Sequence, residues 1–173
     1  MHYKTISYRE PTIADGAAIW RLVHQSGGLD TNSAYCYLLL SKDFAETCAV
    51  AESEDGIVGF VTAYLPPGRG DTLFVWQIGI APNLRGKGVA TGLLLELMRR
   101  DACNGIAFLE ATVSPSNLAS RALFASLAQR LGTTLAEYPC FDATLFPDTN
   151  HEPEHLLRAG PFTLSLMHRK PEA

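Results

Sequence analysis

The chain has 173 residues, a formal net charge of −4 and 47% hydrophobic residues. This length and apolar content fit one domain with a sizeable core. The mild acidity and the lack of a basic run argue against a nucleic-acid-binding protein. No apolar run approaches the roughly 20 residues that span a bilayer, which argues against a membrane partner.

The N-terminal residues and the cysteines indicate the cellular compartment. Met1 leads directly into strand-like sequence, so we expect no signal peptide. Four scattered cysteines without a Cys-x-x-Cys pair are typical of reduced thiols in a cytoplasmic protein. We therefore expect a single cytoplasmic domain covering residues 1–173.

The first half of the chain predicts antiparallel strands and two helices. Gly27-Gly28 ends the first helix, Ser33 is a candidate N-cap for the second, and Asp55-Gly56 is a typical hairpin turn. Alternation and helical periodicity then place the elements. Strands are expected over residues 3–9, 45–51, 57–65 and 71–80, and helices over 13–25 and 33–40.

The second half predicts a strand–helix–strand–helix unit followed by two strands. A long helix is expected from Gly86 to about Cys103, and Ser116 or Asn117 caps another that runs to about Leu131. Strands are expected over residues 106–113, 134–141 and 161–169. This order predicts an α/β fold with a mixed central sheet of about seven strands and about four helices.

The most informative segment lies between Ile78 and Leu97. An apolar run ends at Ile80, and Arg85-Gly86-Lys87-Gly88 leads straight into an apolar helix. Glycines at a helix start let backbone N–H groups approach an anion, and the helix dipole adds positive potential there. The segment therefore predicts a pyrophosphate cradle, with an ordinary basic strand-to-helix turn as the alternative.

Two other phosphate-binding loops are excluded by spacing. A Walker A loop needs Ser or Thr after Gly-Lys, whereas Gly88 follows Lys87 and Val89 follows that. A dinucleotide fingerprint needs its third glycine three residues after the second, where this chain has Thr91.

The spacing Arg85-x-x-Gly88-x-Ala90 instead resembles the acyl-CoA signature of the GNAT superfamily of N-acetyltransferases. The order of elements over about residues 3–141 resembles the GNAT fold as well. The resemblance implies acetyl-CoA as cosubstrate and no metal. It implies that the cofactor contacts Ile78, Gly79, Ile80, Arg85, Gly86, Lys87, Gly88, Val89, Ala90, Asn117 and Phe124.

Longer segments resemble the diaminobutyrate acetyltransferase family of ectoine biosynthesis. They include Trp76–Ile80, Leu109–Val113, the Ser114-Pro115-Ser116-Asn117 segment and the stretch from Gly28 to Tyr37. This resemblance implies transfer of an acetyl group to the γ-amine of L-2,4-diaminobutyrate, an osmolyte precursor, by a homodimeric enzyme. The alternatives are another small amine as acceptor, or a non-catalytic domain that binds acyl-CoA.

Glu110 is the leading candidate for proton acceptor. Only about one primary amine in a thousand is neutral near pH 7.4, so the reaction needs a base. Glu110 lies in the apolar strand 106–113, where burial makes a carboxylate a stronger base. Many superfamily members carry a glutamate on the preceding strand, where this chain has Trp76 and Gln77. The alternatives are a salt-bridged structural residue or a ligand of the substrate ammonium.

A second polar cluster, with Asp30 and Tyr35, lies where GNAT enzymes commonly build the acceptor pocket. Asp30 is a candidate ligand for an ammonium group and Tyr35 a candidate donor, whereas loop and packing roles are the alternatives. Trp76 is a candidate pocket wall with a cation–π face, or else a core residue.

Two further positions bear on the site. Superfamily members often place a tyrosine that protonates the thiolate where this chain has Phe124, so Tyr35, Ser120 or water is left as donor. His151 to His155 match the His-Glu-x-x-His pattern of zinc proteases, but Pro153 opposes the continuous helix that this motif needs. We interpret the segment as a loop, and the family resemblance implies that His151 closes over the acceptor.

Overall fold

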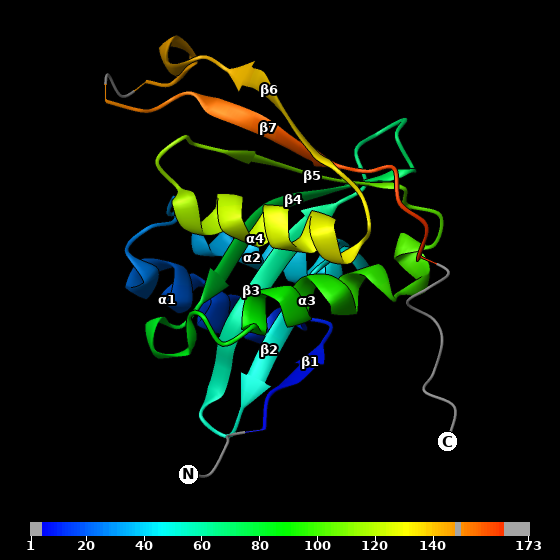
Figure 1. The fold of residues 1–173 in the computed structure, drawn as a ribbon. Coiled ribbons are helices and arrows are strands. Elements are labelled where there is room, and N and C mark those ends of the chain that lie inside the picture. The colour runs from blue at the N-terminus through cyan, green and yellow to red at the C-terminus, as the bar shows by residue number, and fades with distance from the viewer. Residues whose placement is uncertain (1–4, 148–149, 165–173) are drawn as a thin grey trace, which may run out of the picture. The chain divides into compact units, whose positions relative to one another are not determined.

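The computed structural model describes residues 5–147 and 150–164. Within them lie four α-helices and one mixed seven-stranded sheet with the order β1-β2-β3-β4-β5-β7-β6 (Figure 1). The helices are α1 (Gly16–Ser26), α2 (Ala34–Asp43), α3 (Val89–Met98) and α4 (Leu118–Arg130). The strands are β1 (Ser7–Arg9), β2 (Ala49–Ser53), β3 (Gly56–Tyr64), β4 (Thr72–Ile80), β5 (Phe108–Val113), β6 (Leu135–Phe141) and β7 (Glu154–Ala159).

The fold class and most elements agree with the sequence prediction. The strands β4 and β5 run parallel, from Thr72 opposite Phe108 to Phe74 opposite Glu110, whereas β5–β7 and β6–β7 are antiparallel. Ser33 caps α2 through its hydroxyl, which accepts from the Cys36 amide at 3.3 Å. No helix in the described part of the chain is long and apolar enough to cross a membrane.

Three element predictions were wrong. Residues 45–47 form a 3₁₀ turn before β2. The helix α3 begins at Val89 rather than Gly86, because Gly86 and Gly88 adopt positive φ angles, which are not helical. It ends at Met98 rather than at about Cys103, and residues 101–103 form a separate 3₁₀ turn. The last strand is residues 154–159 rather than 161–169; residues 161–164 are not strand, and 165–169 lie outside the described residues.

The chain forms two compact units that share β4. Unit 1 comprises residues 1–64 and 76–104, and unit 2 comprises residues 65–75 and 105–173. The boundary therefore falls inside β4, between Val75 and Trp76.

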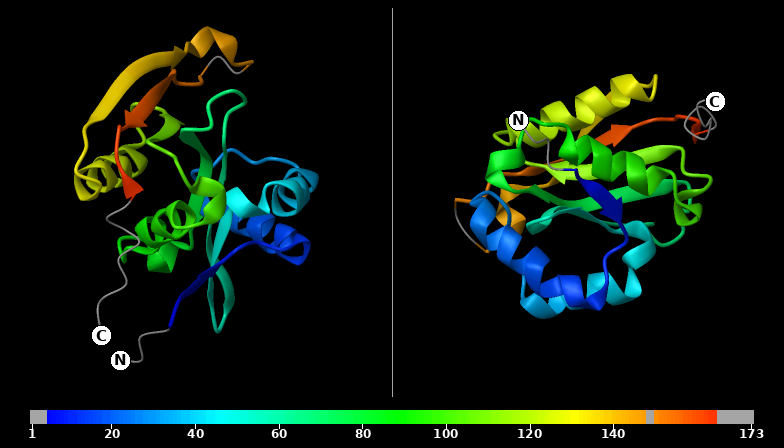
Figure 2. Two further views of the ribbon diagram at one scale, coloured as in Figure 1. Left: turned by 90° about the vertical axis from the view of Figure 1, so that its right-hand side faces the viewer. Right: turned by 90° about the horizontal axis from the view of Figure 1, so that it is seen from below.

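In unit 1, helices cover both faces of the strands. The helices α1 and α2 pack together on one face of β2 and β3, and α3 packs on the opposite face (Figure 2). One core cluster contains Ile19, Leu22, Val23, Tyr37, Leu40, Cys48, Val50 and Phe60. Four side chains of α3 are also fully buried, Leu93, Leu94, Leu97 and Met98. In unit 2, α4 packs against β6 and β7.

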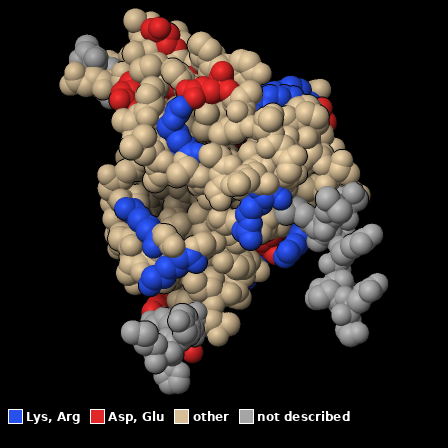
Figure 3. Space-filling model, viewed as in Figure 1, with Lys and Arg blue, Asp and Glu red and all other residues tan. Residues whose placement is uncertain are grey.

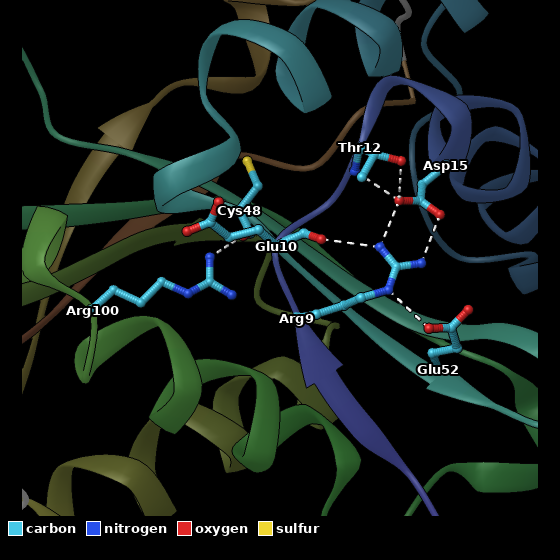
Figure 4. Close-up of polar contacts among 7 residues, drawn as sticks. All are labelled: Arg9, Glu10, Thr12, Asp15, Cys48, Glu52 and Arg100. Carbon is cyan, nitrogen blue, oxygen red and sulfur yellow. Dashed lines mark hydrogen bonds and ion pairs between the residues drawn. The ribbon is translucent and has the colours of Figure 1, made fainter.

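Polar contacts tie the edge strand β1 into unit 1 (Figure 4). The Arg9 guanidinium donates to both carboxylate oxygens of Asp15, at 2.8 and 3.0 Å, and to Glu52 at 2.8 Å. Asp15 also accepts from the Thr12 amide at 2.7 Å. The hydrogen bonds from Arg9 hold the pKa of Asp15 at about 2, below its ordinary value of 3.8. Figure 4 also draws a separate contact, in which Arg100 donates to the Cys48 carbonyl just before β2, at 2.5 Å.

We predict that Asp15→Asn lowers the free energy of unfolding by about 1–2 kcal/mol at pH 7. Because the folded pKa is depressed, this contribution is present above about pH 4 and is lost as the pH falls toward 2. Urea unfolding of wild type and variant at pH 7, 4 and 2 measures the difference.

The matched control is Asp43→Asn, since the ion pair of Asp43 within the described part of the chain is with the neighbouring Lys42 on the surface. It is expected to change stability little at any of these pH values. A deficit for Asp15→Asn that stays constant down to pH 2 contradicts the prediction.

Candidate active site

The segment between β4 and α3 has the geometry of an anion cradle. Gly86 has φ +72° and Gly88, the N-cap of α3, has φ +81°. Such left-handed glycines turn successive N–H groups toward one side, as in anion-binding nests. The amides of the first α3 turn have no acceptor within the helix. The backbone therefore has the conformation that an anion cradle needs, starting three residues before the helix, and its use as a pyrophosphate site stays a prediction.

The two basic residues of the cradle differ in their contacts. Arg85 donates from Nη2 to the Ser26 carbonyl at 2.9 Å and from Nε to the Ile80 carbonyl at 3.4 Å. Lys87 is exposed. Basic side chains gather over the region where Figure 1 draws α1 and the loop before α3 (Figure 3). Arg85 therefore joins the cradle to the end of α1, a contact that sequence reasoning missed.

The predicted acceptor residues of unit 1 are accessible. Tyr35 on α2 is 66% exposed, Trp76 on β4 is 42% exposed, and Asp30 lies exposed between α1 and α2. The interpretation of Trp76 as a core residue is thus wrong. The interpretation of Tyr35 as a packed helix residue is wrong for the same reason.

A hydrogen-bond chain joins the segment between α1 and α2 to the buried Gln77 side chain of β4. The side-chain Nδ2 of Asn32 donates to the Tyr37 hydroxyl at 3.4 Å, and that hydroxyl donates to Gln77 Oε1 at 2.9 Å. Gln77 Nε2 then donates to the Asp30 carbonyl at 2.8 Å. On the neighbouring strand β3, Thr62 Oγ1 accepts from the backbone N–H of Gln77 at 3.2 Å. Sequence reasoning noted Gln77 only as a departure from the family pattern.

Gly79 serves packing on the same strand. A Cβ atom at Gly79 would lie 2.6 Å from the Phe60 ring and 2.9 Å from Leu29 Cδ1. The missing side chain therefore lets the segment after α1 approach β4 closely. The predicted cofactor role of Gly79 concerns its backbone and stays a prediction.

Within unit 2, Glu110 is 1% exposed, which confirms the burial expected from its apolar strand. Arg69 Nη1 donates to both of its carboxylate oxygens, at 2.9 and 3.0 Å. Arg158, opposite Glu110 in the β5–β7 register, also donates to Oε1. The Arg158 guanidinium lies over the Phe108 ring, 3.8 Å from its centroid.

The two oxygens of Glu110 differ in their partners. Oε1 accepts from both guanidinium groups, whereas among the described residues Oε2 accepts only from Arg69. Arg69 is the accessible partner, because almost half of its side chain is exposed. Neither arginine was anticipated: the last strand was misplaced, which hid Arg158, and Arg69 lies in the loop before β4. These ion pairs match the alternative of a salt-bridged residue, and the assignment of Glu110 as base stays a prediction.

The start of α4 carries the remaining predicted cofactor contacts. Asn117 is the N-cap of α4, and its side-chain oxygen accepts from the Ser120 amide at 3.0 Å, as expected from its position. Its carboxamide nitrogen is not used in that cap. Phe124 is 2% exposed and belongs to the core of unit 2.

The 151–155 segment is not helical. Glu154 and His155 begin β7, so the expectation of a loop was wrong for these two residues. The His151 ring stacks on Phe146 with centroids 3.6 Å apart, and Glu152 accepts from the Ser116 amide at 3.2 Å. Among the described residues, no group of three or more potential ligands could hold a metal ion. Two residues before this segment, 148 and 149, lie outside the described part.

The comparison with known proteins agrees with this geometry. The model of the acetyltransferase (GNAT) family matches residues 17–128, which include α1, the cradle and most of α4. The chain belongs to the GNAT acetyltransferase family. GNAT relatives include the L-2,4-diaminobutyric acid acetyltransferase of Marinococcus halophilus, 50% identical over 92% of each chain. The enzyme of the same name from Halalkalibacterium halodurans is 50% identical over 91% of this chain and 82% of its own.

A solved GNAT structure is similar over almost the whole chain. It is the diaminobutyrate acetyltransferase EctA from Paenibacillus lautus in complex with L-2,4-diaminobutyric acid and coenzyme A. The two structures superimpose with a TM-score of 0.90 and 43% sequence identity, covering 93% of this chain and 98% of that one. The expected GNAT fold is therefore confirmed.

We predict that Gly88→Val weakens coenzyme A binding at least tenfold. A branched side chain at φ +81° is strained, and it reorients the amides of the cradle. Isothermal titration calorimetry with coenzyme A measures the affinity.

Gly132→Val is the matched control, since Gly132 has φ +66° with open space around it but lies after α4. It is expected to lose stability from the same strain and to retain coenzyme A affinity. Equal affinity of folded Gly88→Val and wild type would rule out the cradle as the pyrophosphate site.

Proposed function

We propose that this protein transfers the acetyl group of acetyl-CoA to the γ-amine of L-2,4-diaminobutyrate. The observation that carries the proposal is the 50% identity, over nine-tenths of both chains, to a diaminobutyric acid acetyltransferase. The exposed side chains of Asp30, Tyr35 and Trp76 add chemical support. The acceptor carries two ammonium groups, which a carboxylate and aromatic faces attract.

We propose that acetyl-CoA binds in an extended manner along unit 1. Its pyrophosphate accepts hydrogen bonds from the amides of residues 85–90, and its pantetheine arm runs along Ile78–Ile80. The left-handed glycines and the free amides of the α3 start support this placement. Asn117 and Phe124 are the proposed contacts from α4. Acetyl-CoA is a cosubstrate here, and the reaction as written needs no metal.

We propose that the acceptor is bound by Asp30, Tyr35, Trp76 and Glu110, with His151 as a further contact. Asp30 pairs with an ammonium group, and Trp76 offers a cation–π face to the same class of cation. Tyr35 contributes a hydrogen-bond donor. The accessibility of the three residues from unit 1 supports their assignment.

The chemical step needs a neutral amine. The neutral γ-nitrogen attacks the thioester carbonyl, the C–S bond breaks, and coenzyme A leaves as the thiolate. The nitrogen loses its second proton as the amide forms, and the thiolate takes up one proton to give the free thiol. We propose that Glu110 accepts the proton of the γ-ammonium through Oε2, directly or through one water. Oε2 accepts only from Arg69 among the described hydrogen bonds, which leaves a lone-pair direction for this proton.

The resemblance also carries a biological setting. We propose that the enzyme acts in ectoine biosynthesis, an osmolyte pathway, as a cytoplasmic homodimer. We further propose that both units belong to one domain over residues 1–173, because β4 runs through both of them. Light scattering on the purified protein tests the dimer.

The function is tested by acetyl-CoA turnover with a panel of amines. Diaminobutyrate is expected to be the preferred acceptor over polyamines, aminoglycosides and peptides with a free N-terminus. A preference for another amine would replace the proposed acceptor. Binding of acetyl-CoA with no turnover on any amine would support the non-catalytic alternative.

We predict that Asp30→Ala raises the KM for diaminobutyrate roughly tenfold or more, because an ammonium loses its charged partner. The KM for acetyl-CoA is expected to change less than twofold. Asp55→Ala, in the β2–β3 hairpin, is the matched control and should alter neither constant. Equal changes in both KM values for Asp30→Ala would exclude it as an acceptor ligand.

We predict that Glu110→Gln loses most turnover near pH 7 and regains part of it toward pH 10. The amine, with a reference pKa of about 10.4, deprotonates itself at high pH, so the base becomes dispensable. Pre-steady-state rates with saturating diaminobutyrate between pH 7 and 10 measure the effect.

A defect that is independent of pH and confined to acceptor binding would instead assign Glu110 to holding the ammonium. Arg158→Lys serves as control for the ion-pair cluster, because it keeps a cation beside Glu110. Arg158→Lys is expected to be less stable than wild type, and its turnover is not expected to show the rise toward pH 10 that is predicted for Glu110→Gln.

A further inference from the structure

We propose that Gln77 is a positioning residue for the acceptor, because its carboxamide holds the loop of residues 28–33, here called the acceptor loop. The inference deepens the proposed function and rests on it. Gln77 acts through the backbone of Asp30 rather than through contact with the substrate. It is the strand residue next to Trp76, and alternation along β4 directs the two side chains to opposite faces.

The orientation of the carboxamide follows from its partners. A backbone carbonyl can only accept, so the group facing the Asp30 carbonyl at 2.8 Å must be the Gln77 NH₂. The carboxamide oxygen is then left to accept from the Tyr37 hydroxyl at 2.9 Å. Glutamine is the side chain of this length that supplies one donor and one acceptor at the same time. A glutamate supplies the donor only when it is protonated.

Burial makes these bonds specific. Gln77 is 7% exposed and Tyr37 is fully buried, so water cannot replace a lost partner easily. The chain of bonds starts at Asn32 and returns to Asp30, which fixes the acceptor loop on both sides of Thr31. The loop's own side chains at Asp30 and Thr31 remain exposed.

Three neighbouring contacts leave Gln77 as the central attachment of the loop. Upstream, Arg85 holds the Ser26 carbonyl at 2.9 Å, and Leu29 packs over Gly79. Downstream, Ser33 is fixed as the cap of α2. Between these points the loop is attached by the Gln77 bond to the Asp30 carbonyl and by the Asn32 bond to the Tyr37 hydroxyl. The direction of the Asp30 carboxylate therefore depends on Gln77.

The variant Gln77→Glu tests this dependence through pH. At low pH the buried acid is protonated and donates to the Asp30 carbonyl, as the amide does. At high pH the carboxylate opposes that carbonyl oxygen, and the loop is released. Among the described residues, Tyr37 is the titratable side chain that bonds Gln77, and burial raises its pKa above the ordinary value of 10.0. Burial also raises the pKa of the neighbouring Cys36 thiol above its ordinary 9.0.

We expect the KM for diaminobutyrate of Gln77→Glu, divided by the wild-type value at the same pH, to rise at least tenfold from pH 6 to pH 9. Loss of the hydrogen bond to the Asp30 carbonyl, together with repulsion between that carbonyl and the new carboxylate, accounts for a change of this size. The KM for acetyl-CoA and the kcat at saturating acceptor are expected to stay within twofold of wild type. A merely structural role would not split the constants in this way.

Two further variants serve as controls. Thr62→Val removes the bonds between Thr62 and the Gln77 backbone while leaving the carboxamide in place. It is expected to lower the melting temperature with a flat KM ratio. Tyr37→Phe keeps the bond to Asp30 and is expected to raise the KM less than Gln77→Met, which removes both bonds.

A KM ratio that does not change with pH, or a defect in kcat or in the KM for acetyl-CoA, would overturn the proposal. If the wild-type enzyme does not acetylate diaminobutyrate, the proposed function fails separately. The attachment is then measured by hydrogen exchange of the amides of residues 28–33. Exchange in Gln77→Glu should exceed wild type at pH 9 and match it at pH 6; equal exchange at both pH values would contradict the attachment.

Discussion

The strand β4, which both units share, sets the positions of the predicted site residues that lie on it and directly after it. Its first residues pair with β5 in unit 2, and its last five residues belong to unit 1. Because the backbone is extended from Thr72 to Ile80, alternate side chains point to opposite faces along its whole length. One strand therefore supplies an exposed Trp76, a buried Gln77 and the entry to the cradle. A change of register in β4 would displace all three together.

The cradle could be predicted from the sequence because its determinants are local. Two glycines with positive φ, a strand before them and an apolar helix after them all fall within twenty residues. The caps at Ser33 and Asn117 are equally local, since each is a side chain that bonds an amide three residues later. Such features need no knowledge of tertiary contacts.

The polar networks could not be predicted in the same way. Gln77 and Asp30 are 47 positions apart, and Arg158 is 48 positions from Glu110. No pattern within one segment reveals such a pairing. The strand at residues 154–159 was also missed, because attention to the His-Glu-x-x-His pattern favoured a loop there. With β7 in place, Arg158 becomes a predictable cross-strand neighbour of Glu110.

The exposure of Trp76 has a practical consequence. The chain has only two tryptophans, and the other, Trp20 on α1, contacts the His24 ring at a tilt of 38°, with ring centroids 3.8 Å apart. An acceptor that covers Trp76 changes the polarity around one of two indole fluorophores. Under the proposed binding of the acceptor at Trp76, intrinsic emission would report acceptor binding without a label or a coupled assay. Trp20→Phe would leave a protein whose fluorescence arises from the proposed acceptor wall alone.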